Sequence, residues 1–157
     1  MNVFHLLQED HRQASSLMIR IKAQFGKADA SSFPMFQALK SALDHHAEVE
    51  EFHVYPVFQQ YEMTRDSAAR ALEDHRRIKV HLEALAAMSR VDYRWVQTFN
   101  ELYETVEHHM RMEEDELFGQ AGEVLTAQEA DELGTRVEVA KKDVSREIPA
   151  PASGLPE

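Results

Sequence analysis

One segment of the sequence occurs twice, and the two copies share ionisable residues more than apolar ones. Both copies read His-His-x-x-x-Glu-Glu, the first starting at His45 and the second at His108. Each is followed, at the same offset, by an aromatic residue and then by Pro or Gly. Upstream, a Glu-Asp-His-Arg element at residues 9–12 recurs at residues 73–76. The chain therefore contains an internal repeat with two related halves. The repeated residue types require a chemical explanation as well as a packing one.

The residues around these elements predict four long helices. Apolar residues recur at spacings of three and four from Phe4 to Phe25 and along three later stretches. Ser32 suits the start of the second helix, Thr64 is the predicted N-cap of the third, and Asp92 opens the fourth. Short turns between long amphipathic helices predict an all-α, antiparallel up-down-up-down four-helix bundle. Five glycines and five prolines in 157 residues agree with a helical chain.

The end of the chain predicts one more helix. Gly119 and Gly122 are expected to close the fourth helix. Residues 126–129, Thr-Ala-Gln-Glu, form a capping-box pattern that opens a short C-terminal fifth helix to about Val144. We expect a single domain over residues 1–145 and a flexible tail over 146–157, since the tail contains three prolines.

Six ionisable residues lie on the predicted inner faces at similar depths. A spacing of four places His46 and Glu50 on one helix face, and the same holds for His109 and Glu113. The number of residues between each of these positions and the nearest predicted turn gives its depth along the bundle axis. These depths differ by only a few residues, which corresponds to several ångströms. The residues expected to converge are His11, His46, Glu50, His75, His109 and Glu113.

Such a cluster inside a bundle predicts a metal site. Each uncompensated buried charge costs several kcal/mol, whereas divalent cations use the imidazole and carboxylate lone pairs directly. The alternative is that the inner histidines and glutamates only pair with one another. Mixed nitrogen and oxygen ligands suit iron, manganese or zinc. Two carboxylates that are able to bridge favour a dinuclear site over a single zinc ion.

At these residues the sequence resembles the hemerythrin-like (HHE cation-binding) family. The resemblance rests on the repeated Glu-Asp-His-Arg and His-His-x-x-x-Glu-Glu elements and covers about residues 3–122. It implies a four-helix bundle with a non-haem di-iron centre, two Fe ions joined by an oxo or hydroxo bridge. The six residues above would be the ligands, with Glu50 and Glu113 as the bridging carboxylates.

One departure from the family pattern bears on function. Oxygen-carrying hemerythrins place a second histidine four residues after that of the third helix, and here that position is Lys79. Two six-coordinate irons need about twelve donor atoms, and the predicted donors supply about ten. About two positions are then open to water, O2, NO or peroxide, as is typical of reactive metal sites.

The remaining ionisable residues near the repeat have lesser expected roles. His53 shares the predicted inner face and is an alternative further ligand, or an ordinary helix-face histidine. His45 and His108 point about 100° away from the ligands and are expected in packing or at the surface. Four acidic residues could accept the free N–H of a ligand imidazole or form a solvated rim: Asp10, Asp74, Glu51 and Glu114.

Composition limits the kinds of binding partner and the cellular location that we expect. A net charge of −11 opposes binding to nucleic acid or an anionic membrane. The absence of cysteine excludes thiolate chemistry, and no secretory signal is evident, so a cytoplasmic protein is expected.

Two classes of function agree with this composition and with the predicted site. One is a protein that binds O2, NO or a related small oxidant as a carrier, sensor or stress-protection protein. The other is an enzyme that decomposes hydrogen peroxide or reduces NO, with a redox partner protein. Iron storage or delivery is a weaker third.

Overall fold

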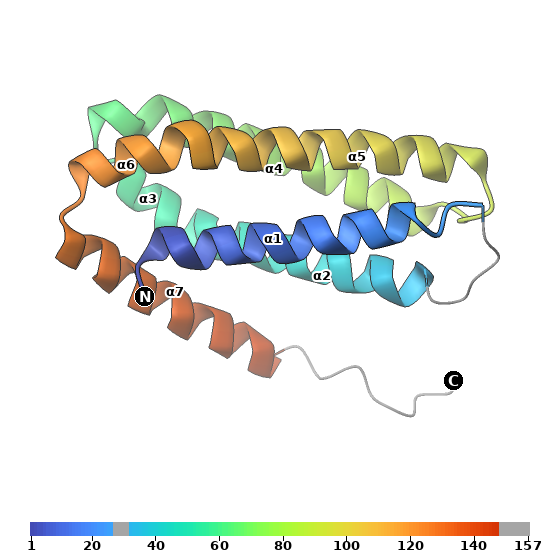
Figure 1. Ribbon diagram of the computed structural model, residues 1–157, viewed down its shortest axis with the longest axis horizontal. Coiled ribbons are helices and arrows are strands. Elements are labelled where there is room, and N and C mark those ends of the chain that lie inside the picture. The colour runs from blue at the N-terminus through green and yellow to red at the C-terminus, as the bar shows by residue number, and fades with distance from the viewer. Residues whose placement is uncertain (27–31, 148–157) are drawn as a thin grey trace.

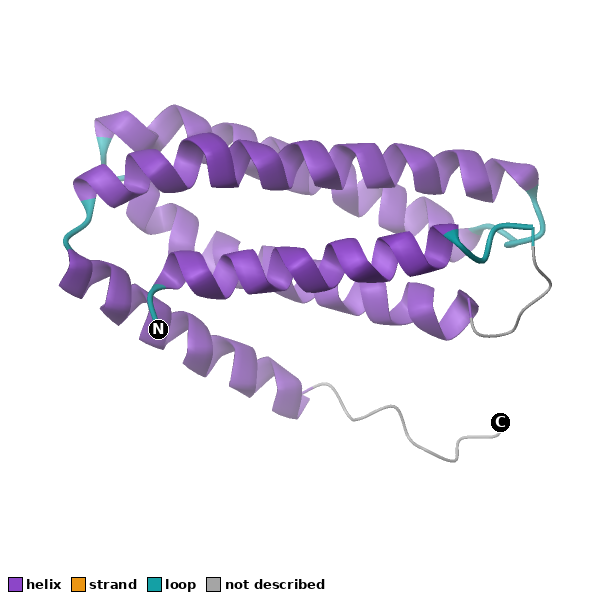
Figure 2. Ribbon diagram, viewed as in Figure 1, coloured by secondary structure: helices purple, strands orange, loops and turns teal. Residues whose placement is uncertain are grey.

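The computed structural model describes residues 1–26 and 32–147, and over these residues the regular structure is helical (Figures 1 and 2). The four helices α1 (Val3–Lys22), α2 (Ser32–Val49), α4 (Glu62–Ala87) and α5 (Tyr93–Met112) run alternately up and down (Figure 1). The predicted antiparallel bundle is therefore confirmed. Two π-helical turns and two short helices complete it: η1 (Glu50–Val54), α3 (Tyr55–Phe58), η2 (Glu113–Leu117) and α6 (Phe118–Val124).

The predicted fifth helix is present as α7 (Ala127–Glu147), which is longer than expected at 21 residues. The capping box forms, because the Glu129 amide donates to Thr126 Oγ1 and the Thr126 amide donates to Glu129 Oε1. Helix α7 lies outside the four-helix bundle, against α1, α2 and η1 (Figure 1). Gly134 permits this approach, since a side chain there would collide with the backbone of Met1. The predicted tail falls mainly on residues 148–157, which lie outside the described residues, and the domain limit at 145 stays a prediction.

Two predicted helix ends are wrong, and one is confirmed. Asp92 caps α5 by accepting a hydrogen bond from the Arg94 amide. Thr64 is not an N-cap, because α4 begins two residues earlier and the Thr64 hydroxyl donates to the Phe58 carbonyl instead. Gly119 and Gly122 do not end a helix either. Both lie within α6 without positive φ, so neither provides the left-handed turn that usually terminates a helix.

The bundle contains two apolar clusters with a layer of ionisable residues between them. One cluster, around Leu7, Phe58 and Leu117, lies toward α3 and α6 and is covered by α7. The other, around Met18, Phe99 and Leu102, fills the half toward the opposite turns. In the described part of the chain, none of the helices has both the length and the apolar character needed to cross a membrane.

The π-helical turns change which residues face the core. In η1 the amide of Tyr55 donates to the carbonyl of Glu50, five residues earlier, rather than to the residue four earlier. The extra residue advances the register by one place. Val54 and Tyr55 are therefore buried, whereas His53 is only half-buried. The predicted inner face of the second helix is correct up to Glu50 and wrong at His53.

Candidate metal centre

The structure brings the six predicted ligand residues together in the ionisable layer. Glu50 and Glu113 are fully buried, and the imidazoles are almost so. Their donor atoms form two groups, each with all its donor atoms within 4.8 Å of one another. The first group is His11, His46, Glu50 and Glu113, and the second is Glu50, His75 and His109. Each group takes both of its histidines from one half of the repeat.

Glu50 lies between imidazoles of the two halves. Its Oε1 is 3.0 Å from His46 Nε2 and 3.2 Å from His75 Nε2. It therefore has the position that a bridging carboxylate requires.

Glu113 repeats this arrangement from the other half. Its Oε1 is 3.0 Å from His109 Nε2 and 3.3 Å from His11 Nε2. The π-helical turns begin at these two glutamates, one turn after His46 and His109 on the same helix faces.

The polar atoms of this layer fit a cation better than they fit one another. Within the described residues, four buried atoms of this layer make no hydrogen bond, although three of them lie at ion-pair distance from a neighbour: His11 Nε2, His46 Nε2, Glu50 Oε2 and Glu113 Oε1. Buried polar groups are almost always hydrogen-bonded, so several orphaned lone pairs at one point indicate an ion. Nitrogen and oxygen donors in this ratio suit iron, manganese or zinc.

The outer ring nitrogens of the four histidines each meet a carboxylate. His11 Nδ1 is 2.6 Å from Glu114 Oε2, and His46 Nδ1 is 2.9 Å from Asp10 Oδ2. The equivalent contacts of the second half are longer: 3.0 Å from His75 Nδ1 to Glu51 Oε2 and 3.3 Å from His109 Nδ1 to Asp74 Oδ2. We call these four acids the outer carboxylates. By accepting the Nδ1 proton, each would leave Nε2 free to bind a metal and would orient the ring.

The pKa values of the layer describe how it balances charge without a metal. Burial opposes protonation of His109, but the charge of Glu113 and hydrogen bonds to Asp74 and Glu113 outweigh it and raise the pKa of His109 to about 10. Burial likewise disfavours ionisation of Glu113, yet the charge of His109 holds the pKa of that carboxyl well below its usual range. The metal-free layer is therefore held by imidazolium–carboxylate pairs.

Tyr55 belongs to the site, although the sequence analysis did not identify it as a site residue. Its hydroxyl oxygen is 2.7 Å from Glu113 Oε2, 3.2 Å from Glu50 Oε1 and 3.1 Å from His75 Nε2. Burial, followed by the charges of Glu113 and Glu50, raises the pKa of the phenol well above its usual value. A cation in this position would reverse that effect, so Tyr55 is a candidate seventh ligand, an oxygen donor beside His75.

The repeat gives Tyr55 a counterpart without a hydroxyl. Phe118 follows the second copy of the motif at the same offset, and its ring stacks on His11 with centroids 6.0 Å apart. Tyr55 lies against His75 with centroids 5.2 Å apart. The two histidine pairs therefore have similar aromatic neighbours, but only one pair has a phenol.

The other predicted residues lie outside the two donor groups. His53 is half-buried and joins neither group, because the π-helical turn rotates it away from the layer. His108 is exposed, and His45 is half-buried at the edge of a cavity. Lys79, which replaces the second histidine of the third helix, is exposed.

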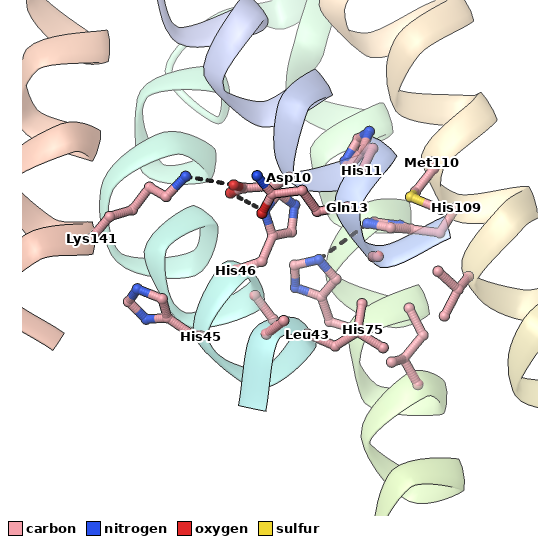
Figure 3. Close-up of a pocket in the computed structure, with 15 residues that line it drawn as sticks. Asp10, His11, Gln13, Leu43, His45, His46, His75, His109, Met110 and Lys141 are labelled. Atoms are coloured by element: carbon pink, nitrogen blue, oxygen red, sulfur yellow. Dashed lines mark hydrogen bonds and ion pairs between the residues drawn. The ribbon is translucent and has the colours of Figure 1, made fainter. Parts of the chain in front are cut away.

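A cavity of about 160 Å³ adjoins the layer, and Tyr55 is not among the residues that line it (Figure 3). The four candidate ligand imidazoles form one side of it, and the other walls are mainly apolar, including Ala14, Leu43, Ile78, Val106 and Met110. Its polar edge consists of Asp10, Gln13, His45 and Lys141 (Figure 3). The volume is several times what one water molecule requires. A diatomic molecule or peroxide in the cavity would lie next to both histidine pairs.

The comparison with known proteins assigns the family. The model of the hemerythrin HHE cation-binding domain matches residues 2–121, so the chain belongs to this family. A crystal structure of a hemerythrin HHE cation-binding domain-containing protein from Mycobacterium kansasii has the same fold, with a TM-score of 0.79 at 22% identity. The match covers 96% of this chain and 94% of that one, and so includes α7. A search of curated protein sequences gave no significant match.

Proposed function

We propose that this protein holds a non-haem di-iron centre and binds a small oxidant such as O2 or NO at it. The six residues His11, His46, Glu50, His75, His109 and Glu113 would be ligands, and Glu50 and Glu113 would bridge. Orphaned lone pairs of four of these residues, in a layer next to an apolar cavity, are the observation that carries the proposal. When bound, the iron pair would supply the binding position and the change of redox state.

The residues around the iron pair would determine how many coordination positions are open and which ligands can reach them. The six residues supply about eight donor atoms, and a bridging oxygen counts once at each iron, so about two of twelve coordination positions stay open. If Tyr55 donates its oxygen, about one remains, and the cavity offers a path to it. The apolar walls would favour a neutral, compact ligand over a hydrated ion, since desolvating an ion is costly. One small molecule per metal pair is the expected stoichiometry.

A second candidate function is the decomposition of hydrogen peroxide or the reduction of NO, with electrons from a partner protein where needed. Tyr55 favours this alternative to simple binding, because cleavage of an O–O or N–O bond consumes protons. The Tyr55 hydroxyl is a buried proton donor within 3.2 Å of both glutamates.

Spectroscopic titration of the iron-loaded protein tests the proposal and separates the two functions. We expect about two irons per chain and one NO bound per iron pair under anaerobic conditions. Binding alone predicts a single stoichiometric change on addition of NO or peroxide, whereas an enzyme predicts turnover over many cycles. A folded protein that takes up no iron would refute the di-iron centre. His109→Ala removes a predicted ligand and should lose iron, and His108→Ala at the exposed neighbouring position is its matched control.

A further inference from the structure

One contact of the layer is not duplicated between the two halves. Asp10 and Asp74 occupy the same place in the repeated element, and each accepts from the Nδ1 of a candidate ligand histidine. The second oxygen of Asp10, Oδ1, is 2.5 Å from Lys141 Nζ of α7 (Figure 3). Among the described residues, the cation nearest to the second oxygen of Asp74 is the exposed Arg77, at 3.9 Å. Asp10 and Asp74 therefore differ in how far a neighbouring cation neutralises their charge.

This difference would reach the metal through an imidazole. A carboxylate paired with an ammonium group is a weaker hydrogen-bond acceptor, so Asp10 attracts the Nδ1 proton of His46 less strongly. The ring would then donate less electron density through Nε2. The side chains of Asp10 and Lys141 are 15% and 31% exposed, so water screens the pair only in part.

Helix α7 holds Lys141 in place from outside the bundle. Leu133 and Val137 bury one face of α7 in the apolar cluster that contains Leu7. Gly134 allows the close approach to the N-terminus described above. Lys141 lies one turn beyond Val137, at the edge of the cavity (Figure 3). The fifth helix thereby contacts the candidate metal centre through Lys141.

We propose that Lys141 acts through Asp10 on His46 and makes the metal position of His11 and His46 chemically different from that of His75 and His109. The position next to Lys141 holds its metal less tightly and is the more easily reduced of the two. The inference rests on the proposed two-metal centre.

Removal of the Lys141 charge tests this proposal with two readouts that do not depend on activity. Lys141→Met keeps most of the side-chain volume, and Lys142→Met on the exposed side of α7 is the matched control. In a Co²⁺ titration of the metal-free protein, Lys141→Met tightens one of two binding steps by about fivefold, the upper range for a partly exposed charge pair. In Mössbauer spectra of the protein loaded with ⁵⁷Fe, one of two iron signals shifts. Lys142→Met changes neither readout.

Three further variants separate this effect from a packing effect. Lys141→Arg keeps the charge and restores the native affinity and spectrum. Asp10→Asn changes the same binding step in the opposite direction, weakening it by about 10- to 100-fold. Val137→Ala added to Lys141→Met loosens α7 and causes no further shift of the iron signals, because α7 then carries no charge that reaches Asp10.

Several results would overturn the proposal. Lys141→Met with native affinity and spectrum would do so, as would equal changes at both metals, weaker binding, or a further spectral shift when Val137→Ala is added to Lys141→Met. A native protein that binds fewer than two metal ions would overturn the di-iron proposal as well. Two ions bound by the native protein, with no effect of Lys141→Met, would overturn only the role of Lys141.

Discussion

Tyr55 and Glu113 come from opposite halves of the repeat, yet the Tyr55 hydroxyl donates a hydrogen bond of 2.7 Å to Glu113 Oε2. The same oxygen is 3.2 Å from Glu50, so one phenol contacts both glutamates of the layer. The π-helical turn η1 makes this possible, because its hydrogen bond from the Tyr55 amide to the Glu50 carbonyl stacks the two residues on one face.

Replacement of Tyr55 by Phe should alter the centre without unfolding the protein. Loss of the hydroxyl removes a donor from two buried carboxylates, which we expect to cost about 1–3 kcal/mol in the metal-free protein. The iron-loaded variant should keep two irons and lose any phenolate-to-iron charge-transfer absorption. Urea unfolding and visible spectra measure both effects. Tyr93→Phe, at an exposed position, is the control. An unchanged visible spectrum would show that Tyr55 is not a ligand.

His109→Ala should lose iron and stability together. The substitution removes a nitrogen donor and leaves the fully buried Glu113 without its closest imidazole, a change that typically costs about 3–5 kcal/mol when one partner of a buried pair is removed. Elemental analysis and denaturant unfolding are the measurements. His108→Ala, one residue away and exposed, should keep both irons. Retention of two irons by His109→Ala would remove this residue from the ligand set.

The metal-free protein should lose stability as pH rises. The pKa of His109 is raised from 6.5 to about 10 in the folded state. A raised pKa means that the stabilisation is fully present below about pH 6.5 and is lost progressively as pH approaches 10. Unfolding free energies measured across this window should fall in the native protein and fall less in His109→Gln. A flat profile in the native protein would contradict the imidazolium–carboxylate pairing.

Metal binding should release protons at neutral pH. The pKa values of His46 and His75 are also raised, because the charge of Glu50 and the hydrogen bonds made by the carboxylates outweigh burial. These imidazoles must become neutral before Nε2 can bind a cation. Titration of the metal-free protein in buffers of different ionisation enthalpy would count the protons. Release of none would mean that the imidazoles do not bind the metal.

Asp74→Asn should weaken metal binding by about 10- to 100-fold, since the amide no longer draws the Nδ1 proton of His109 toward a negative charge. Asp115→Asn, at an exposed site in η2, should have no such effect. Equal affinities for the two variants would show that the outer carboxylate is not needed.

The cavity can be tested by filling it. Ala14 lies in its wall and is 5% exposed. We expect Ala14→Leu to retain two irons but to bind NO more slowly, because the larger side chain occupies part of the 160 Å³ beside the imidazoles. Stopped-flow measurement of NO binding checks this, with the exposed Ser16→Leu on the same helix as control. An unchanged rate would place the path of the ligand elsewhere.

The sequence alone was sufficient to predict the convergence of His11, His46, Glu50, His75, His109 and Glu113. They recur at fixed offsets in two copies, and helical periodicity converts those offsets into depths and faces. Periodicity also predicted the buried stripe that runs from Trp95 in α5 to Leu117 in η2.

The same periodicity failed at Tyr55 and His53. Five residues on an α-helix turn the side chain about 140° from its start, which placed Tyr55 outside the predicted site. In the structure, a π-helical turn puts Tyr55 above Glu50 and rotates His53 away. The aromatic residue at the same offset in both copies was the available signal. Lys141 could not be predicted, because its contact with Asp10 depends on where α7 packs.

The extra residue in η1 also means that Tyr55 depends on chain length as well as on residue identity. With the present length, an ordinary α-helix would turn the phenol about 140° away from Glu50, whereas with one residue fewer the phenol would follow Glu50 by four residues and lie on its face without a π-helical turn. One inserted or deleted codon would thus exchange an α-helical turn for a π-helical one, while the tyrosine and every ligand keep their places. An alignment that scores substitutions but closes single-residue gaps would not detect such a change.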